Sequence, residues 1–186
     1  MATPRIQILL SHPNYSNSRA NRALVEMASR LDGVEVTHLE DLYPDGGIDC
    51  DAEVARLVLA DLLVLQFPMQ WYSTPPALKA WQDRVLTRMF YINPDTEGAK
   101  LAGRPLMVAA TLGNRSSAYT AEGVNLFSAA DLLKPLQSTA NRCGLSWQEP
   151  FLVYEARHAT DEALASAARS YLDRLISTSL SSAIPA

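Results

Sequence analysis

Apolar runs alternate with amphipathic stretches along most of the chain. Three runs have the near-continuous apolar character of strands buried on both faces of a parallel sheet: RIQILL (5–10), DLLVLQF (61–67) and RPLMVAATLG (104–113). VEVTHL (34–39) alternates apolar and polar residues with the period of a strand. A last strand is predicted over LSWQEPFLVYEA (145–156), with an interruption at Pro150.

Helical periodicity fills the segments between these strands. Ser18 is a suitable N-cap for SRANRALVEMASRL, which places its apolar residues on one helical face, and Gly33 ends this helix. Further helices are predicted over 49–60 with Asp49 or Asp51 as cap, over 75–86 from Pro75 and Pro76, over 127–144 with a kink or break at Pro135, and over 160–177 with Thr160 or Asp161 as cap.

Strands and helices therefore alternate five times, which predicts an α/β fold with a parallel sheet covered by helices on both faces. Right-handed crossovers leave few topologies, and a unit of this size favours a five-stranded sheet in the order 2-1-3-4-5. We expect one domain over residues 1–178 and a frayed tail over 179–186.

Composition and charge narrow the classes of function. Of 186 residues, 48% are hydrophobic and 19% charged, and the net charge is −4. A mildly acidic chain with scattered Lys and Arg has no electrostatic footprint for nucleic acid. Cys50 and Cys143 fit no metal-ligand spacing, and neither do the three histidines, so no metal site is expected. The start of the chain has no apolar run long enough for a signal or membrane segment, so we expect a cytoplasmic protein with free thiols.

Ligands of open parallel sheets bind at the carboxyl ends of the strands, and three loops leave those ends here. The first, SHPNYSNSRAN (11–21), is rich in hydroxyls and amides and leads into a helix N-terminus, which favours an anion such as phosphate. Ser18 and Asn21 add donors, and His12 or Arg19 adds charge. The alternative is simply a capped helix after a polar loop. The loop matches neither a P-loop nor GxGxxG.

The second loop, PMQWYSTPP (68–76), presents flat apolar side chains and backbone amides between prolines. Such a surface suits a planar heteroaromatic ring, although Trp71 and Tyr72 could instead pack on neighbouring helices. In the third loop, TLGNRSSAY (111–119), Gly113 permits close approach of a ligand to the backbone. Tyr119 could donate to a ring oxygen or be an ordinary surface tyrosine.

The three loops together resemble the flavodoxin-like NAD(P)H:quinone oxidoreductases. Among these, the chain is most similar to the bacterial quinone reductases that are ancillary subunits of glutathione-gated potassium-efflux systems, and to their general-stress relatives. The resemblance runs from the first strand to about residue 155 and includes FPMQWYSTPPALKAW (67–81), its most specific segment, LYPD (42–45) and PLQSTANRCGLSW (135–147).

This resemblance implies a flavodoxin-like three-layer sandwich and a non-covalent flavin. FMN is favoured and FAD stays an alternative, since the relatives that favour FAD extend further at the C-terminus. The matching phosphate-binding positions are His12, Ser18, Arg19, Ala20 and Asn21. The ring-binding positions are Met69, Gln70, Trp71 and Tyr72, fixed by Pro68, together with Thr111, Leu112, Gly113 and Asn114. Tyr119 matches a tyrosine at the edge of the flavin ring, and homodimers with the site at the interface are expected.

The chain departs from the family in two places, the 111–114 segment and residue 125. Its usual Thr-Thr-Gly-Gly is replaced by Thr111-Leu112-Gly113-Asn114, which removes one hydroxyl and one glycine. A histidine six residues after the tyrosine is replaced by Asn125, which can form hydrogen bonds but cannot carry a proton at neutral pH.

The sequence therefore predicts a flavin-dependent oxidoreductase that passes hydride from NAD(P)H to a quinone-like acceptor by a ping-pong mechanism, with Tyr119 and Asn125 nearest the chemistry. A second hypothesis is a regulatory flavoprotein that docks on a potassium-efflux transporter, in which case it would sit at the inner face of the membrane. A one-electron flavodoxin is disfavoured because such carriers are usually more acidic than a net charge of −4.

Overall fold

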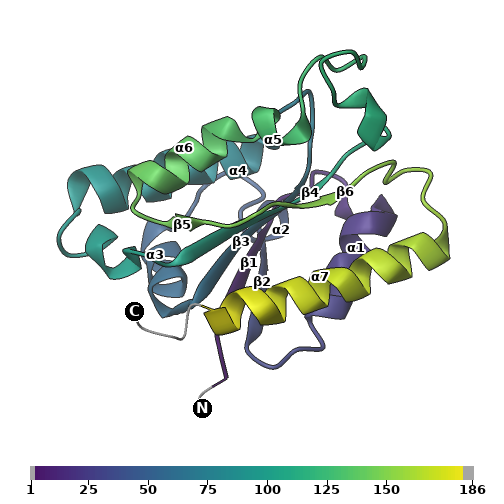
Figure 1. Ribbon diagram of the computed structural model, residues 1–186. Helices are drawn as coiled ribbons and strands as arrows, with labels where there is room; N and C mark the ends of the chain where they lie inside the picture. The colour runs from purple at the N-terminus through teal and green to yellow at the C-terminus, as the bar shows by residue number, and fades with distance from the viewer. Residues whose placement is uncertain (1–2, 182–186) are drawn as a thin grey trace.

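A parallel β-sheet runs through the middle of the molecule between two layers of helices (Figure 1). The structure is a computed structural model that describes residues 3–181. The strands follow the order β2-β1-β3-β4, and β5 and β6 both pair with β4 at the next position. Their bounds are β1 Ile6–Leu10, β2 Val34–His38, β3 Leu62–Pro68, β4 Pro105–Thr111, β5 Ser146–Trp147 and β6 Phe151–Val153.

The predicted α/β architecture and strand order are thereby confirmed, with the fifth strand divided in two. The division falls at Pro150, where the sequence predicted an interruption. Proline has no backbone N–H to donate to the ladder, so pairing with β4 stops after Trp147 and resumes at Phe151.

The helices divide between the two faces of the sheet (Figure 1). Helices α1 and α7 cover one face, and α2 to α6 cover the other. The bounds are α1 Arg19–Ala28, α2 Leu39–Leu42, α3 Cys50–Leu59, α4 Pro76–Trp81, α5 Ala129–Leu132, α6 Lys134–Arg142 and α7 Asp161–Ser181, and the shorter helices are η1 Tyr15–Asn17, η2 Gln82–Leu86, η3 Arg88–Ile92, η4 Gly98–Leu101 and η5 Ser116–Ala118.

Helix boundaries differ from the prediction at two places, the end of the helix that begins at Pro76 and the end of α7. The helix predicted over 75–86 continues through the π-helical segments η2 and η3 to Ile92. The helix predicted over 127–144 is broken at Leu133, as the predicted kink or break at Pro135 allowed, because this proline is tolerated only in the first turn of α6. Helix α7 includes residues 179–181, which were predicted to be a frayed tail; Ser179 is buried, and its packing extends the helix. The rest of that predicted tail, 182–186, lies outside the described residues.

Alternation along the strands builds two apolar cores. Ile8 and Val64 face α1 and α7, where they lie in one cluster with Leu24 and Tyr171. Their chain neighbours point to the opposite face, as Leu65 does. The sheet is thus buried on both sides, which explains the near-continuous apolar runs in the sequence.

A buried carboxylate ties α3 to α4 within the second core. The Glu53 side chain has no solvent exposure. Its Oε1 accepts hydrogen bonds from the Tyr43 hydroxyl at 2.8 Å and from Arg56, and its Oε2 accepts from Trp81 Nε1 at 2.8 Å. Both carboxylate oxygens are therefore satisfied, as burial of a charge requires.

Candidate functional site

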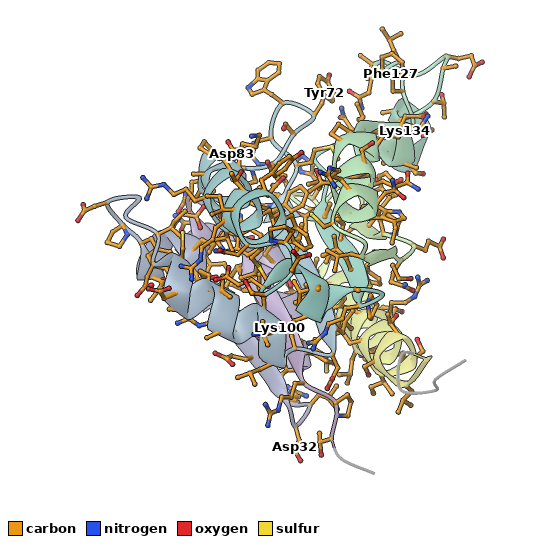
Figure 2. The ribbon with its side chains drawn as sticks, turned by 90° about the vertical axis from the view of Figure 1, so that its left-hand side faces the viewer. Asp32, Tyr72, Asp83, Lys100, Phe127 and Lys134 are labelled. Atoms are coloured by element: carbon orange, nitrogen blue, oxygen red, sulfur yellow. The ribbon has the colours of Figure 1, made fainter. Side chains whose placement is uncertain are left out.

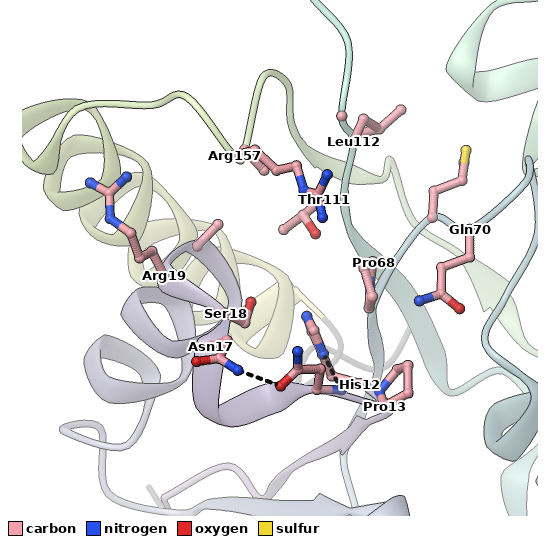
Figure 3. Close-up of a pocket in the computed structure, with 15 residues that line it drawn as sticks. His12, Pro13, Asn17, Ser18, Arg19, Pro68, Gln70, Thr111, Leu112 and Arg157 are labelled. Atoms are coloured by element: carbon pink, nitrogen blue, oxygen red, sulfur yellow. Dashed lines mark hydrogen bonds between the residues drawn. The ribbon is translucent and has the colours of Figure 1, made fainter.

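A pocket of about 620 Å³ opens at the carboxyl ends of β1, β3 and β4, where the three loops meet (Figure 3). The first loop contributes His12, Pro13, Asn14, Asn17, Ser18, Arg19 and Ala20; the second contributes Pro68, Met69 and Gln70; the third contributes Thr111, Leu112 and Gly113. Segments that are far apart in the sequence thus form one site at the point where the strand order reverses.

One end of the pocket is the N-terminus of α1. Ser18 is its N-cap and accepts a hydrogen bond from the Asn21 backbone N–H at 3.3 Å. The backbone N–H groups of Arg19 and Ala20 have no acceptor among residues 3–181. Free N–H groups at the positive end of a helix dipole attract an anion, so this end of the pocket suits a phosphate.

The two basic residues of the first loop, Arg19 and His12, differ in their surroundings and in their charge. Arg19 forms an ion pair with Asp161 at 2.6 Å, at the surface. Burial lowers the pKa of His12, with the nearby Glu40 carboxylate acting in the opposite direction. His12 Nδ1 accepts the Asn14 backbone N–H at 3.1 Å, which requires that nitrogen to be unprotonated. Because the pKa lies below the usual value, the ring is neutral at neutral pH.

Arg157 is a pocket residue that the sequence analysis did not identify. It follows β6, and the segment that carries it is bonded to the third loop: Leu112 N donates to Val153 O at 2.8 Å, and Ala156 N donates to Leu112 O at 3.0 Å. Figure 3 shows the Arg157 side chain beside Thr111. Its guanidinium has no ion pair or hydrogen bond within the described part of the chain. Its position in the sequence could have indicated it, because it follows the carboxyl end of a strand, as the three predicted loops do.

Asn21 lies beneath the pocket rather than in its wall. The side chain is buried, and its amide Nδ2 donates to Thr111 Oγ1 at 3.0 Å and to Ser18 Oγ at 3.3 Å. Its predicted contact with a ligand remains a prediction; in the structure it joins two hydroxyls that do line the pocket.

The second loop contains a two-residue turn with unusual backbone geometry. Gln70 and Ser73 pair through two hydrogen bonds of 3.0 Å, and the residues between them, Trp71 and Tyr72, have φ of 46° and 66°. Positive φ at both central positions is normally reserved for Gly, Asn or Asp. Trp71 is 92% exposed and Tyr72 is 46% exposed. The turn therefore holds two aromatic side chains away from the core, and the N–H groups of Trp71 and Tyr72 have no acceptor among the described residues.

The two predicted catalytic residues are Tyr119, at the end of the third loop, and Asn125, which contacts this turn. The Tyr72 hydroxyl donates to Asn125 Oδ1 at 3.2 Å, while Asn125 Nδ2 is buried with no hydrogen-bond partner in the described chain. Tyr119 is largely buried, and its ring centroid lies 5.6 Å from that of Tyr154. Burial raises the pKa of Tyr119, so its phenol stays protonated at neutral pH.

The family departures have separate structural roles. Leu112 is buried and belongs to the apolar core under the loop. Where the family motif has a threonine hydroxyl, this chain therefore has a side chain that packs in the core. The Asn114 carbonyl accepts from Glu155 N at 3.0 Å and ties the loop to the segment after β6. Asn114 itself does not line the pocket, and neither do Trp71, Tyr72, Tyr119 and Asn125.

The described part of the chain shows neither a metal centre nor a membrane-spanning helix. Within residues 3–181, no three His, Cys, Asp or Glu side chains are grouped so that they could hold a metal ion. None of the described helices combines the length and the apolar character needed to cross a membrane.

Comparison with known proteins gives consistent matches over nearly the whole chain. A family profile described as "Flavodoxin-like fold" matches residues 4–175. The glutathione-regulated potassium-efflux system ancillary protein KefF of Klebsiella pneumoniae is 43% identical over 171 residues, 92% of this chain and 94% of the relative. General stress protein 14 of Bacillus subtilis is 38% identical over 165 residues, 89% of this chain and 93% of the relative.

A solved structure agrees with these matches. The general stress protein 14 of Treponema denticola, crystallised in complex with FMN, is 33% identical and superposes with a TM-score of 0.87 over 94% of this chain and 99% of that one. The strand order, the loop pocket and the sequence matches lead to one assignment: the chain belongs to the flavodoxin-like fold family described by that profile.

Proposed function

We propose that this protein is an FMN-dependent oxidoreductase that transfers electrons from NAD(P)H to a quinone or a related acceptor. The observation that carries the proposal is one pocket with two unlike ends. One end, the anion end, offers the free N–H groups of Arg19 and Ala20 at the start of α1. Beside the other end, the ring end, a turn displays Trp71 and Tyr72. The FMN complex of the Treponema denticola relative supports the choice of cofactor.

The residues present fit a flavin mononucleotide. The N–H groups of Arg19 and Ala20 and the Ser18 and Thr111 hydroxyls would hold its phosphate. The unpartnered N–H groups of Trp71 and Tyr72 would bond heteroatoms of its ring, and their side chains would lie along it. When bound, the flavin would supply two-electron chemistry, with NAD(P)H and acceptor reacting in turn by a ping-pong mechanism.

The chain's own contribution is orientation and the placing of hydrogen-bond donors. Because its pKa is raised by burial, the Tyr119 hydroxyl keeps its proton at neutral pH and can stabilise negative charge that develops at the edge of the ring. Asn125 Nδ2 is a second donor, and it cannot release a proton. We infer that Tyr119 is the main donor to this charge and that Asn125 can add a hydrogen bond but no proton, where the family resemblance implies a histidine.

A homodimer is part of this proposal. Tyr72 and Phe127 stand at the same end of the molecule (Figure 2). The second loop and the segment 124–127 expose apolar side chains: Trp71, Tyr72, Val124, Leu126 and Phe127. A group of exposed apolar residues beside a pocket is typical of an interaction surface. A second copy that covered it would close the ring end of the pocket. The free thiols of Cys50 and Cys143 support a cytoplasmic location.

The test begins with a spectrum. Purified protein mixed with FMN should gain flavin absorbance near ~450 nm, and anaerobic NADPH should bleach it with one reductant consumed per flavin, restored by quinone. Tyr119→Phe should bind FMN but turn over slowly, whereas Tyr154→Phe, which alters the neighbouring ring, should leave turnover unchanged. Protein that neither binds FMN nor oxidises NADPH would refute the proposal.

A second candidate function is docking to a potassium-efflux transporter as an ancillary subunit. The KefF relative, which matches over 92% of this chain, supports it. Co-purification with a membrane transporter, and potassium efflux that persists when Tyr119→Phe has slowed electron transfer, would favour docking as the main role. Loss of efflux in step with turnover would favour the enzyme.

A further inference from the structure

A chain of buried hydrogen bonds runs from α7 through the sheet to the anion end of the pocket. The Tyr171 hydroxyl donates to Gln66 Oε1 at 3.1 Å. Gln66 Nε2 donates to the Asn21 main-chain oxygen at 3.1 Å and to Asn21 Oδ1 at 3.3 Å. Asn21 Nδ2 then donates to Ser18 and to Thr111. The three linking side chains, Tyr171, Gln66 and Asn21, are all buried.

The direction of this chain is fixed by a backbone carbonyl. The Asn21 main-chain oxygen can only accept, so the amide of Gln66 must turn its nitrogen toward it. Gln66 Nε2 then also faces the Asn21 side chain, so Asn21 Oδ1 must be the acceptor. The nitrogen of Asn21 is thereby aimed at the two hydroxyls. Turning either amide over would set two donors or two acceptors face to face.

This direction determines what the hydroxyls can offer a ligand. Ser18 Oγ accepts from both the backbone N–H and the side-chain amide of Asn21, which occupies both of its lone pairs. Thr111 Oγ1 accepts from the same amide. Neither hydroxyl hydrogen has an acceptor among the described residues, and both residues line the pocket.

We propose that Gln66 and Tyr171 are positioning residues that hold Ser18 and Thr111 as hydrogen-bond donors toward the pocket and so select a phosphate, whose oxygens accept. The inference rests on the proposed flavin-binding function and deepens it, because it assigns the preference for the phosphorylated cofactor to residues that never touch it. Gln66 is the only amide side chain in the otherwise apolar strand β3. The chain of hydrogen bonds from Tyr171 to Ser18 and Thr111, here called the relay, explains why a polar residue is buried there.

The test compares FMN with riboflavin, which lacks the phosphate, by quenching of flavin fluorescence in Gln66→Met. Without the Gln66 amide nothing orients Asn21, so FMN affinity should fall about tenfold while riboflavin affinity stays within about twofold. Gln7→Met is the matched control. Gln7 is also buried, on the adjacent strand β1, but bonds Thr37 at 2.9 Å and does not line the pocket, so both affinities should be unchanged.

The outcomes separate the two proposals. If the unmodified protein binds neither flavin, the proposed function fails. If it binds FMN and Gln66→Met weakens FMN and riboflavin by the same factor, or weakens neither, the relay has no part in phosphate selection and the inference is overturned. Should Gln66→Met not fold, Tyr171→Phe decides: it removes only the donor to Gln66 and should lower FMN affinity about threefold with riboflavin unaffected, and an unchanged ratio refutes the inference.

Discussion

Replacing Trp71 by glycine should leave the stability of the flavin-free protein almost unchanged, although it removes the largest side chain type. Trp71 has a φ of 46° and is 92% exposed. The Trp71 side chain contributes little to the core, and its left-handed backbone conformation is unfavourable for a bulky residue. We therefore expect this side chain to contribute to ligand binding and not to the stability of the fold.

The expected change in the free energy of unfolding of Trp71→Gly is the sum of three effects that partly cancel. A tryptophan can bury roughly 250 Å², of which less than about a tenth is covered here, so the lost burial is about 0.5 kcal/mol. Relief of the left-handed backbone returns roughly 1 kcal/mol or more. The greater freedom of glycine in the unfolded chain costs about 0.5–1 kcal/mol. The free energy of unfolding should therefore change by no more than about 0.5 kcal/mol, while flavin affinity drops.

Trp81, ten residues later, is the contrasting control. It is 2% exposed, and its Nε1 donates to Glu53 at 2.8 Å, so Trp81→Ala should lose about 3–5 kcal/mol. Both variants are measured by urea denaturation at two protein concentrations a decade apart. A loss in Trp71→Gly that depends on concentration would come from a dimer contact. A concentration-independent loss above ~1.5 kcal/mol would refute the reasoning, because no packing in the folded chain accounts for it.

Three other predictions concern single side chains. Arg157→Ala should weaken FMN about three- to tenfold in low salt and leave riboflavin unaffected, while the exposed Arg169→Ala should change neither; equal loss of both flavins would contradict a phosphate contact. Glu53→Gln should destabilise the fold by about 2–4 kcal/mol in urea denaturation, because an amide must set a donor against either Trp81 Nε1–H or Arg56; a neutral effect would show that the carboxylate is dispensable. Burial raises the pKa of Cys143 to about 11, so its thiol remains protonated at pH 8 and Ellman's reagent should modify it only in denaturant; rapid labelling of Cys143 in the folded protein would contradict its burial.

The sheet and the position of the pocket could be predicted from sequence because both follow from simple periodicities. Strands buried on two faces are almost continuously apolar, and the loops that follow their carboxyl ends must meet at one edge. Pro150 indicated the break in the last strand for an equally local reason. The extension of α7 past residue 178 was missed because polar Thr178 and Ser179 resemble a tail in sequence and are buried only through tertiary packing.

The finer parts of the site depend on contacts that sequence separation hides. Arg157 reaches the pocket because its segment bonds to the third loop, about forty residues earlier. Gln66 is visible in sequence as a polar residue in an apolar run, but its partner Tyr171 lies 105 residues away. The left-handed turn at Trp71 and Tyr72 could not be foreseen, since bulky residues rarely adopt positive φ.

The two ends of the pocket are held by opposite means, and this division bears on where specificity arises. At the anion end the Asn21 side chain is fixed by buried hydrogen bonds that admit one arrangement, and it holds the Ser18 and Thr111 hydroxyls, so we expect this end to be selective for one chemical group. At the ring end the aromatic side chains are exposed, the turn is strained, and Asn125 Nδ2 lacks a partner within the described chain. At this end the exposed rings and the free amide of Asn125 gain contacts only when a ligand or a second chain binds. If the proposed function holds, differences in acceptor between this protein and its relatives should therefore arise from the turn at 70–73 and from Asn125, and not from the first loop.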